Sequence, residues 1–252
     1  MHILRKAARK YGDHGLAGIT IAFKHRHMPR IPAVQSNEYL GWLQFAVPGM
    51  LERGNVDCFD WAIRHLPSDA PIVEIGSFCG LSTNVMTYLK RHHGKTNRLI
   101  TCDRWIFERR DKTAELDDSG VSFDDYREFV RETFLRNAHM FSRHDLPFTV
   151  ELFSDEFFEA WTARDTMNDV FGRSIALGGE ISFCYIDGSH LYDVAKRDFA
   201  NADRFLQRGG FILLDDSGDS THHESRLVAQ EVLSDARYKL VTRNPNYLFQ
   251  KV

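Results

Sequence analysis

From residue 71 onward, short apolar runs alternate with amphipathic segments, and this alternation constrains the fold more than any other feature of the sequence. Each apolar run has the length and composition of a buried strand. The five runs are PIVEIG (71–76), RLITCD (98–103), FTVELF (148–153), ISFCYID (181–187) and FILLDD (211–216). Strands that are apolar on both faces are typical of a parallel sheet covered by helices on each side. We therefore expect an α/β, doubly wound, Rossmann-like fold.

Helices with one apolar stripe are expected between these strands. They span 55–67, 82–91, 122–137, 155–163, 191–207 and 223–236. Asn55 is expected to cap the first of them, and Gly209-Gly210 to close the fifth. The runs YKLVTR and YLFQKV then flank Asn244-Pro245-Asn246, which indicates a hairpin. The expected sheet is thus seven-stranded and parallel with a reversed last strand, unlike the dinucleotide-binding arrangement.

Two segments lie outside this alternation. Residues 1–30 hold seven Lys or Arg and a single acid, Asp13. We expect residues 1–54 to form a basic N-terminal arm with helical structure, either solvated or acting as a lid over an anionic substrate. Residues 55–252 form the main domain, in which the long connection 104–146 is expected to be a substrate-side insertion.

The composition excludes several classes of protein. The chain has 252 residues and a formal net charge of −3, which gives no global attraction to nucleic acid. No apolar stretch approaches the roughly 18 residues that a membrane-spanning helix needs, and no secretory signal is visible. The four cysteines lack metal-ligand spacing and are expected to be buried thiols. We expect a cytoplasmic protein with a small-molecule partner, and a homo-oligomer is compatible with the sequence.

The turn after the first apolar run indicates a nucleoside ligand. A dinucleotide site requires a glycine where the pyrophosphate approaches the backbone, but Phe78 stands there between Gly76 and Gly80. Asp103 ends the second run, where a carboxylate accepts hydrogen bonds from ribose hydroxyls. A ribose site without a pyrophosphate site favours S-adenosylmethionine. The alternative is a turn that serves packing alone.

Three further residues extend this candidate site. Ser154 and Asp155 follow the third run and are expected beside the adenine. Glu74 is a charge inside an apolar strand, where burial is costly unless the group is paired. A ligand ammonium or an N–H of the glycine turn is the expected partner of Glu74.

Acids also end the fourth and fifth runs, at Asp187 and at Asp215-Asp216. Neighbouring strands lie about 4.8 Å apart, so these three carboxylates would converge and repel each other unless a cation is bound. Oxygen ligands favour Mg²⁺, with Ca²⁺ or Mn²⁺ as alternatives. His190, three residues beyond Asp187, is a candidate general base. The alternatives are acids that cap helices or meet solvent, and a histidine that caps a helix or lies on the surface.

Together, four motifs resemble those of class I S-adenosylmethionine-dependent methyltransferases. They are VEIGSFCGLS (73–82), RLITCD (98–103), YIDGSH (185–190) and GGFILLDDS (209–217). Within that class, residues 55–252 resemble the metal-dependent O-methyltransferases of the catechol and macrocin types. The resemblance implies that the methionine part of the cofactor contacts Glu74, Gly76, Ser77, Gly80 and Ser82. It also implies that Asp103 binds the ribose, that Ser154 and Asp155 approach the adenine, and that Asp187, Asp215 and Asp216 hold Mg²⁺.

Two departures favour the sugar-modifying branch over the catechol branch. Catechol enzymes have a lysine where this chain has His190, and an aspartate-asparagine pair where it has Asp215-Asp216. We expect an O-methyltransferase that acts on a hydroxyl of a sugar-containing or other small-molecule metabolite, with Asp187 and His190 as catalytic residues. The alternatives are a metal-independent methyltransferase with His190 as the base and a non-catalytic module that binds S-adenosylmethionine. A nicotinamide oxidoreductase ranks last because of Phe78.

Overall fold

The structure is a computed structural model that describes residues 29–252 except 36, 108–114 and 117–118. The chain divides into two units, residues 1–30 and residues 31–252, and the second carries the fold described below. Most of the expected basic arm, and residues 108–114 and 117–118 of the expected insertion 104–146, lie outside the described residues.

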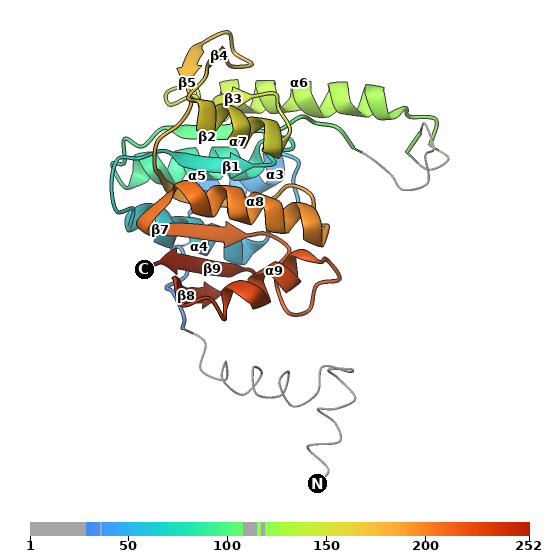
Figure 1. Ribbon diagram of the computed structural model, residues 1–252. Coiled ribbons are helices and arrows are strands. Elements are labelled where there is room, and N and C mark those ends of the chain that lie inside the picture. The colour runs from blue at the N-terminus through green and yellow to red at the C-terminus, as the bar shows by residue number, and fades with distance from the viewer. Residues whose placement is uncertain (1–28, 36, 108–114, 117–118) are drawn as a thin grey trace. The chain divides into compact units, whose positions relative to one another are not determined.

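The second unit is built on a seven-stranded sheet of order β3-β2-β1-β6-β7-β9-β8. Six strands run in one direction, and β9 runs antiparallel to both of its neighbours, β7 and β8 (Figure 1). The strands of the sheet are β1 Ile72–Ile75, β2 Leu99–Cys102, β3 Phe148–Val150, β6 Ile181–Ile186, β7 Leu206–Leu214, β8 Tyr238–Arg243 and β9 Tyr247–Lys251. The expected parallel sheet with a reversed last strand is confirmed, and the reversed strand lies inside the sheet rather than at its edge.

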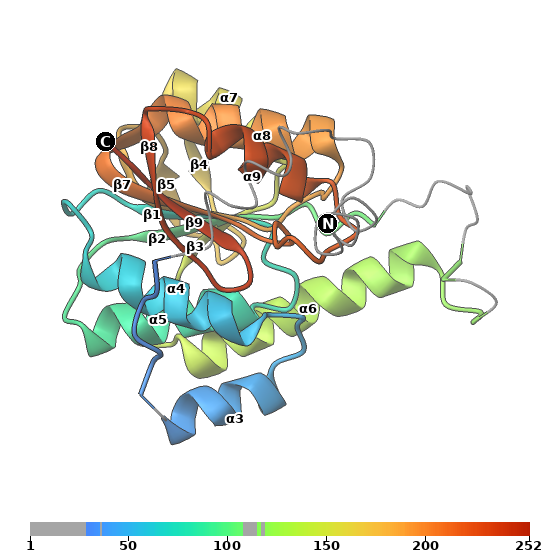
Figure 2. The same ribbon diagram turned by 90° about the horizontal axis from the view of Figure 1, so that it is seen from below.

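Helices cover both faces of the sheet (Figure 2). Helices α7, α8 and α9 lie on one face, and α4, α5 and α6 lie on the other, with α3 outside them. Their bounds are α3 Glu38–Ala46, α4 Arg53–Arg64, α5 Leu81–His92, α6 Phe123–Phe141, α7 Ser154–Ala163, α8 Tyr192–Phe205 and α9 Ser225–Val232. The main core cluster joins α3, α4 and α5 to the sheet through fully buried side chains such as Phe59, Ile63 and Met86. The doubly wound expectation is confirmed.

Three elements differ from the expectation or were not defined by it. Helix α3 lies within residues 1–54, where helical structure was expected without defined bounds, and Asn37 caps it by accepting the N–H groups of Tyr39 (2.9 Å) and Leu40 (3.3 Å). Helix α4 begins at Arg53, so Asn55 lies inside the helix and does not cap it. A short antiparallel ribbon, β4 Thr166–Asn168 with β5 Ser174–Ala176, precedes β6. Its three-residue strands are too short to show an alternation of apolar and polar residues in the sequence.

Strand β7 begins earlier than expected, at Leu206, and runs through both glycines that were expected to close the preceding helix. A Cβ atom on Gly210 would lie 2.9 Å from the backbone oxygen of Gln207 and 3.0 Å from that of Ser182. The glycine therefore permits close approach of β7 to β6, where the strand register is irregular. Within the described residues, no helix combines the length and the apolar character that crossing a membrane requires.

Candidate active site

The candidate site lies at the carboxyl edge of the parallel strands. Strands β1, β2, β6 and β7 pair in parallel, so the residues that follow them share one edge of the sheet. Those residues are Gly76, Asp103, Asp187 and Asp215. The structure therefore places the glycine turn and these three acids at one edge of the sheet.

The glycine turn is packed directly against the end of β6. Gly76 has φ 83°, and a Cβ atom there would lie 2.0 Å from the backbone oxygen of Asp187. Gly80, with φ 89°, is the N-cap residue of α5. Phe78 also has a positive φ of 45°, which is rare for a bulky side chain and marks local strain. The turn is therefore a backbone loop of fixed conformation that leads directly into the N-terminus of α5.

Asp103 clamps this turn. Its Oδ2 accepts the N–H groups of Ser77 (2.8 Å) and Phe78 (2.9 Å), and its Oδ1 accepts that of Trp105 (2.6 Å). Burial raises the pKa of Asp103, and these backbone hydrogen bonds oppose the rise. A carboxylate offers about four acceptor positions, so at most one is left for a ribose hydroxyl. The sequence-based expectation that Asp103 accepts both ribose hydroxyls therefore does not fit the clamped arrangement.

Glu74 is fully buried in β1. The hydroxyl groups of Ser82 and Thr83, in the first turn of α5, donate to its two oxygens at 2.5 Å each. The protein partners of Glu74 are therefore these hydroxyl groups and not an N–H of the glycine turn, while the other expected partner, a ligand ammonium, stays a prediction. Burial raises the pKa of Glu74 to about 8, an effect that the two hydroxyl groups only partly offset. Burial therefore favours the protonated form of this carboxyl group, and its two hydrogen bonds tie α5 to β1.

The raised pKa of Glu74 predicts a pH-dependent stability. Between its unperturbed pKa of 4.5 and about 8, the folded chain holds a proton that the unfolded chain has released. The free energy of unfolding therefore falls as the pH rises through this window, by about 1.4 kcal/mol per pH unit from this group. Glu74→Gln, which cannot ionise, removes that contribution. Urea denaturation of both proteins across the window measures the difference, and curves that stay parallel would contradict the assignment.

Asp187, which is half-buried, and Asp215, which is buried, form a pair of carboxyl groups within hydrogen-bonding reach of each other. Burial raises the pKa of Asp187 well above its usual range, and the charge of Asp215 raises it further. The hydroxyl of Tyr185 donates to Asp187 Oδ2 at 3.0 Å. The side-chain amides of Asn55 and Asn246 donate to Asp215 Oδ1, the second at 2.7 Å. Each carboxyl group thus has one oxygen held by protein donors.

Asp216 does not join this pair. It has φ 48°, and its Oδ2 lies 3.3 Å from Nε2 of His190 and 3.2 Å from Nε2 of His223. The two imidazole rings are 4.6 Å apart. Burial lowers the pKa of His190, an effect that the charge of Asp216 partly offsets. The structure therefore brings together two of the three expected metal ligands and places the third with the expected base.

Whether a divalent cation fits this edge of the sheet depends on the side chains that could bind it. Among the residues that the structure describes, no group of three or more His, Cys, Asp or Glu side chains is arranged to hold a metal ion. Asp187 Oδ1 and Asp215 Oδ2 accept no hydrogen bond from the Tyr185 hydroxyl or the two asparagine amides, and the two carboxyl groups contact each other. Two adjacent carboxyl groups suit a hard cation, which removes their mutual repulsion. The fit therefore rests on these two residues.

The expected adenine residues open helix α7. Ser154 is the first residue of α7, and Asp155 pairs with Arg197 of α8 at 3.2 Å. The preceding Phe153 is 41% exposed, and the guanidinium of Arg104 lies 5.4 Å from the centre of its ring. An exposed aromatic ring at this edge offers a surface on which a flat ligand stacks.

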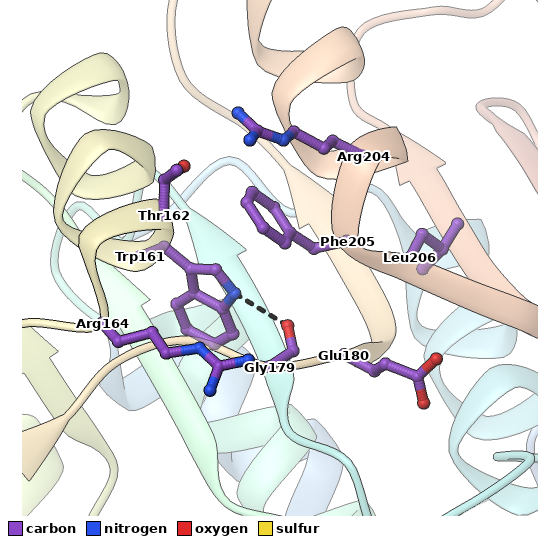
Figure 3. A pocket seen from close by; sticks show the side chains of 8 residues that line it. All are labelled: Trp161, Thr162, Arg164, Gly179, Glu180, Arg204, Phe205 and Leu206. Atoms are coloured by element: carbon purple, nitrogen blue, oxygen red, sulfur yellow. Dashed lines mark hydrogen bonds between the residues drawn. The ribbon is translucent and has the colours of Figure 1, made fainter.

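A cavity of about 330 Å³ lies at the opposite edge of the sheet, between the ends of α7 and α8 and the starts of β6 and β7 (Figure 3). Trp161 and Phe205 form its apolar wall, with Arg164 and Arg204 on either side. Both arginines stand at helix C-termini, where a cation offsets the negative end of the helix dipole. The cavity contains none of the expected site residues, and we do not place the chemistry there.

Residues 73–217 match the protein family described as a methyltransferase domain, and this range is more than half of the chain. The chain belongs to this methyltransferase family. No curated protein matches the sequence.

Solved structures share the fold of this methyltransferase at low sequence identity. The O-methyltransferase TomG from Streptomyces achromogenes, in complex with S-adenosylmethionine, is 12% identical with a TM-score of 0.51, covering 93% of this chain and 96% of that one. A methyltransferase from Podospora anserina, bound to S-adenosylhomocysteine, is 14% identical with a TM-score of 0.51 and covers 96% and 97% of the two chains. The O-methyltransferase NovP is 16% identical with a TM-score of 0.50 and covers 79% and 80%.

Three residues of the site were missed by sequence reasoning. Asn55 was interpreted as a helix cap and Asn246 as a hairpin turn, yet both contact Asp215. His223 lies in a loop beside another histidine, and its sequence context carries no signal of its contact with Asp216.

Proposed function

We propose that this methyltransferase transfers the methyl group of S-adenosylmethionine to a hydroxyl of a small-molecule metabolite, with sugar-containing acceptors as the first candidates. One observation carries the proposal. The glycine turn clamped by Asp103 touches the end of β6 at Asp187, the first member of the carboxyl pair. A nucleoside bound at the turn would therefore present its reactive end beside two acids.

The cofactor would be held along the carboxyl edge. We assign the methionine part to the segment that contains Glu74, Gly76, Ser77, Gly80 and Ser82. The ribose is assigned to the remaining acceptor position of Asp103, and the adenine to Ser154 and Asp155. The nucleosides bound by TomG and by the Podospora methyltransferase support this choice of ligand.

The hydroxyl that accepts the methyl group must lose its proton and lie in line with the sulfonium carbon, which is chiefly a task of orientation. We propose that Asp187 and Asp215 hold Mg²⁺ or another hard divalent cation. When bound, such a cation stabilises the charge that develops on a hydroxyl oxygen. His190 accepts the proton, and Asp216 offsets the charge of the resulting imidazolium. Asp216 is therefore proposed as the partner of His190. It could act as a third metal ligand only if its side chain broke its contacts with His190 and His223.

The contact between His190 and Asp216 also favours a second candidate, a methyltransferase that uses this pair without a metal. An aspartate that orients a histidine base is sufficient for proton transfer in other enzymes.

The four cysteines are buried free thiols. Their state supports a reducing cytoplasm as the site of action.

Labelled methyl transfer tests the proposal. The purified protein is incubated with methyl-labelled S-adenosylmethionine and a panel of sugars, sugar nucleotides and catechols, with and without EDTA. We expect transfer to a hydroxyl, loss of transfer in EDTA, and recovery on addition of Mg²⁺. His190→Ala is expected to lower kcat by about 10²-fold.

Each other outcome of this assay would support a different conclusion. Transfer that survives EDTA would favour the metal-independent candidate. Cofactor binding without transfer to any acceptor would favour a non-catalytic binding module. Failure to bind S-adenosylmethionine would contradict the proposed function itself.

A further inference from the structure

Two buried asparagines converge on one oxygen of Asp215. Asn55 comes from α4 and is 0% exposed, and Asn246 comes from the hairpin between β8 and β9 and is 2% exposed. The side-chain amide of each donates a hydrogen bond to Asp215 Oδ1, from Asn246 at 2.7 Å. The three residues belong to segments far apart in the sequence, so the contact depends on how α4 and the hairpin dock.

The hydrogen bonds of Asn246 fix the orientation of its amide. Its Oδ1 accepts the backbone N–H groups of Ser217 (2.9 Å) and Gly218 (3.1 Å). Its Nδ2 donates to Asp215 Oδ1 and to Asn55 Oδ1, the latter at 3.1 Å. All donor and acceptor positions of the amide are therefore used. A flipped amide would turn an oxygen toward Asp215, so the observed assignment is the one that the network permits.

The hairpin that carries Asn246 is itself held against α4. Asn244 Nδ2 donates to Asp57 Oδ2 at 3.0 Å, and the N–H of Tyr247 donates to Ser217 Oγ at 2.9 Å. Gly54 of α4 faces the backbone oxygen of Asn244 with no room for a Cβ atom. The two asparagine amides are thus presented to Asp215 from a rigid support.

Asp215 is therefore held asymmetrically. Both amides contact Oδ1, and the other side-chain partner of the Asp215 carboxyl group is the carboxyl group of Asp187. Amides are neutral donors, so they orient the carboxylate without neutralising it. A lysine or arginine in their place would compete with a cation for the same charge.

We propose that Asn55 and Asn246 are positioning residues that lock the carboxylate of Asp215 beside Asp187 in the orientation that holds a divalent cation. This inference rests on the proposed function of the site. Partners that orient metal-binding side chains typically change metal affinity by about 10–100-fold when they are removed. Neither asparagine is assigned to S-adenosylmethionine, so cofactor affinity separates this role from that of the cofactor site.

Mn²⁺ binding tests the inference, because Mn²⁺ replaces Mg²⁺ at oxygen ligands and is detected directly by electron paramagnetic resonance. Asn246→Ala and Asn55→Ala are compared with the wild type in the full-length protein. We expect each to weaken Mn²⁺ binding by about 10–100-fold. The affinity for S-adenosylhomocysteine, measured by calorimetry on the same samples, is expected to stay within about threefold of the wild type. The backbone N–H groups of Ser217 and Gly218 donate to Asn246 and not to Asn55, so the Asn55 variant remains informative if Asn246→Ala fails to fold.

Asn97→Ala is the matched control. Asn97 is a buried asparagine, 1% exposed, whose amide donates to the backbone oxygens of Ser68 (2.8 Å) and Ala70 (2.7 Å) at the other edge of the sheet. Its loss is expected to lower the melting temperature without changing Mn²⁺ affinity. Unchanged Mn²⁺ affinity in both test variants, an equal loss in Asn97→Ala, or no Mn²⁺ binding by the wild type would overturn the inference. Retained binding of S-adenosylhomocysteine in those cases would leave the cofactor assignment standing.

Discussion

Asp215→Ala is expected to reduce methyl transfer by about 10³-fold, because a group that stabilises the developing charge contributes several kcal/mol to the transition state. Asp215 lies in the carboxyl pair with Asp187 and outside the glycine turn. The affinity for S-adenosylhomocysteine is therefore expected to stay within about threefold of the wild type. Labelled methyl transfer and calorimetric titration measure the two effects on the same protein.

Two further variants distinguish a loss of catalysis from a loss of the folded structure. Asp215→Asn keeps the shape of the side chain and removes its charge, and the same loss of transfer is expected. Asp219→Ala removes an acid from the same loop that pairs with Arg243 and is 53% exposed at its side chain. This control is expected to retain activity. An Asp215 variant with transfer near the wild-type rate would show that the carboxyl pair has no part in the reaction.

Gly54→Ala is expected to lower the free energy of unfolding by about 3 kcal/mol or more, because an inserted methyl group meets backbone rather than a flexible side chain. A Cβ atom on Gly54 would lie 1.8 Å from the backbone oxygen of Asn244. Helix α4 and the hairpin must separate to admit it, which also moves Asn55 and Asn246 away from Asp215. Urea denaturation and methyl transfer are expected to show a joint loss of stability and activity.

Gly41→Ala is the matched comparison within a helix. Gly41 lies in α3, and nothing is within 4 Å of the position that its Cβ would take. Alanine there is expected to raise stability by about 0.5–1 kcal/mol through helix propensity alone. Equal effects of the two substitutions would contradict the tight docking of α4 on the hairpin.

The sheet was predictable because its strands are buried on both faces. All four residues of β1 and of β2, and all six of β6, are buried, and such runs stand out in the sequence. Helix α3 gave no comparable pattern. Its buried Leu40 and Leu43 alternate with Trp42 and Phe45, which are 64% and 92% exposed, so no single apolar stripe is visible.

The site was predictable only where topology alone sets the geometry. Parallel strands bring Asp103, Asp187 and Asp215 to one edge whatever the loops do. The contacts of Asn55 and Asn246 depend instead on the docking of distant segments. Asparagine is also common in caps and turns, which gave both residues a local explanation. The side chain of Asp216, in turn, follows a strained backbone conformation that the sequence does not specify.

A crystal structure of the protein with S-adenosylhomocysteine tests the central claim most directly. The account predicts the ribose at Asp103, the homocysteine along the glycine turn from Gly76 to Gly80, and the sulfur facing Asp187 and Asp215. The nucleoside bound elsewhere, such as in the cavity between the ends of α7 and α8, would contradict it, as would the absence of any bound nucleoside at saturating concentration.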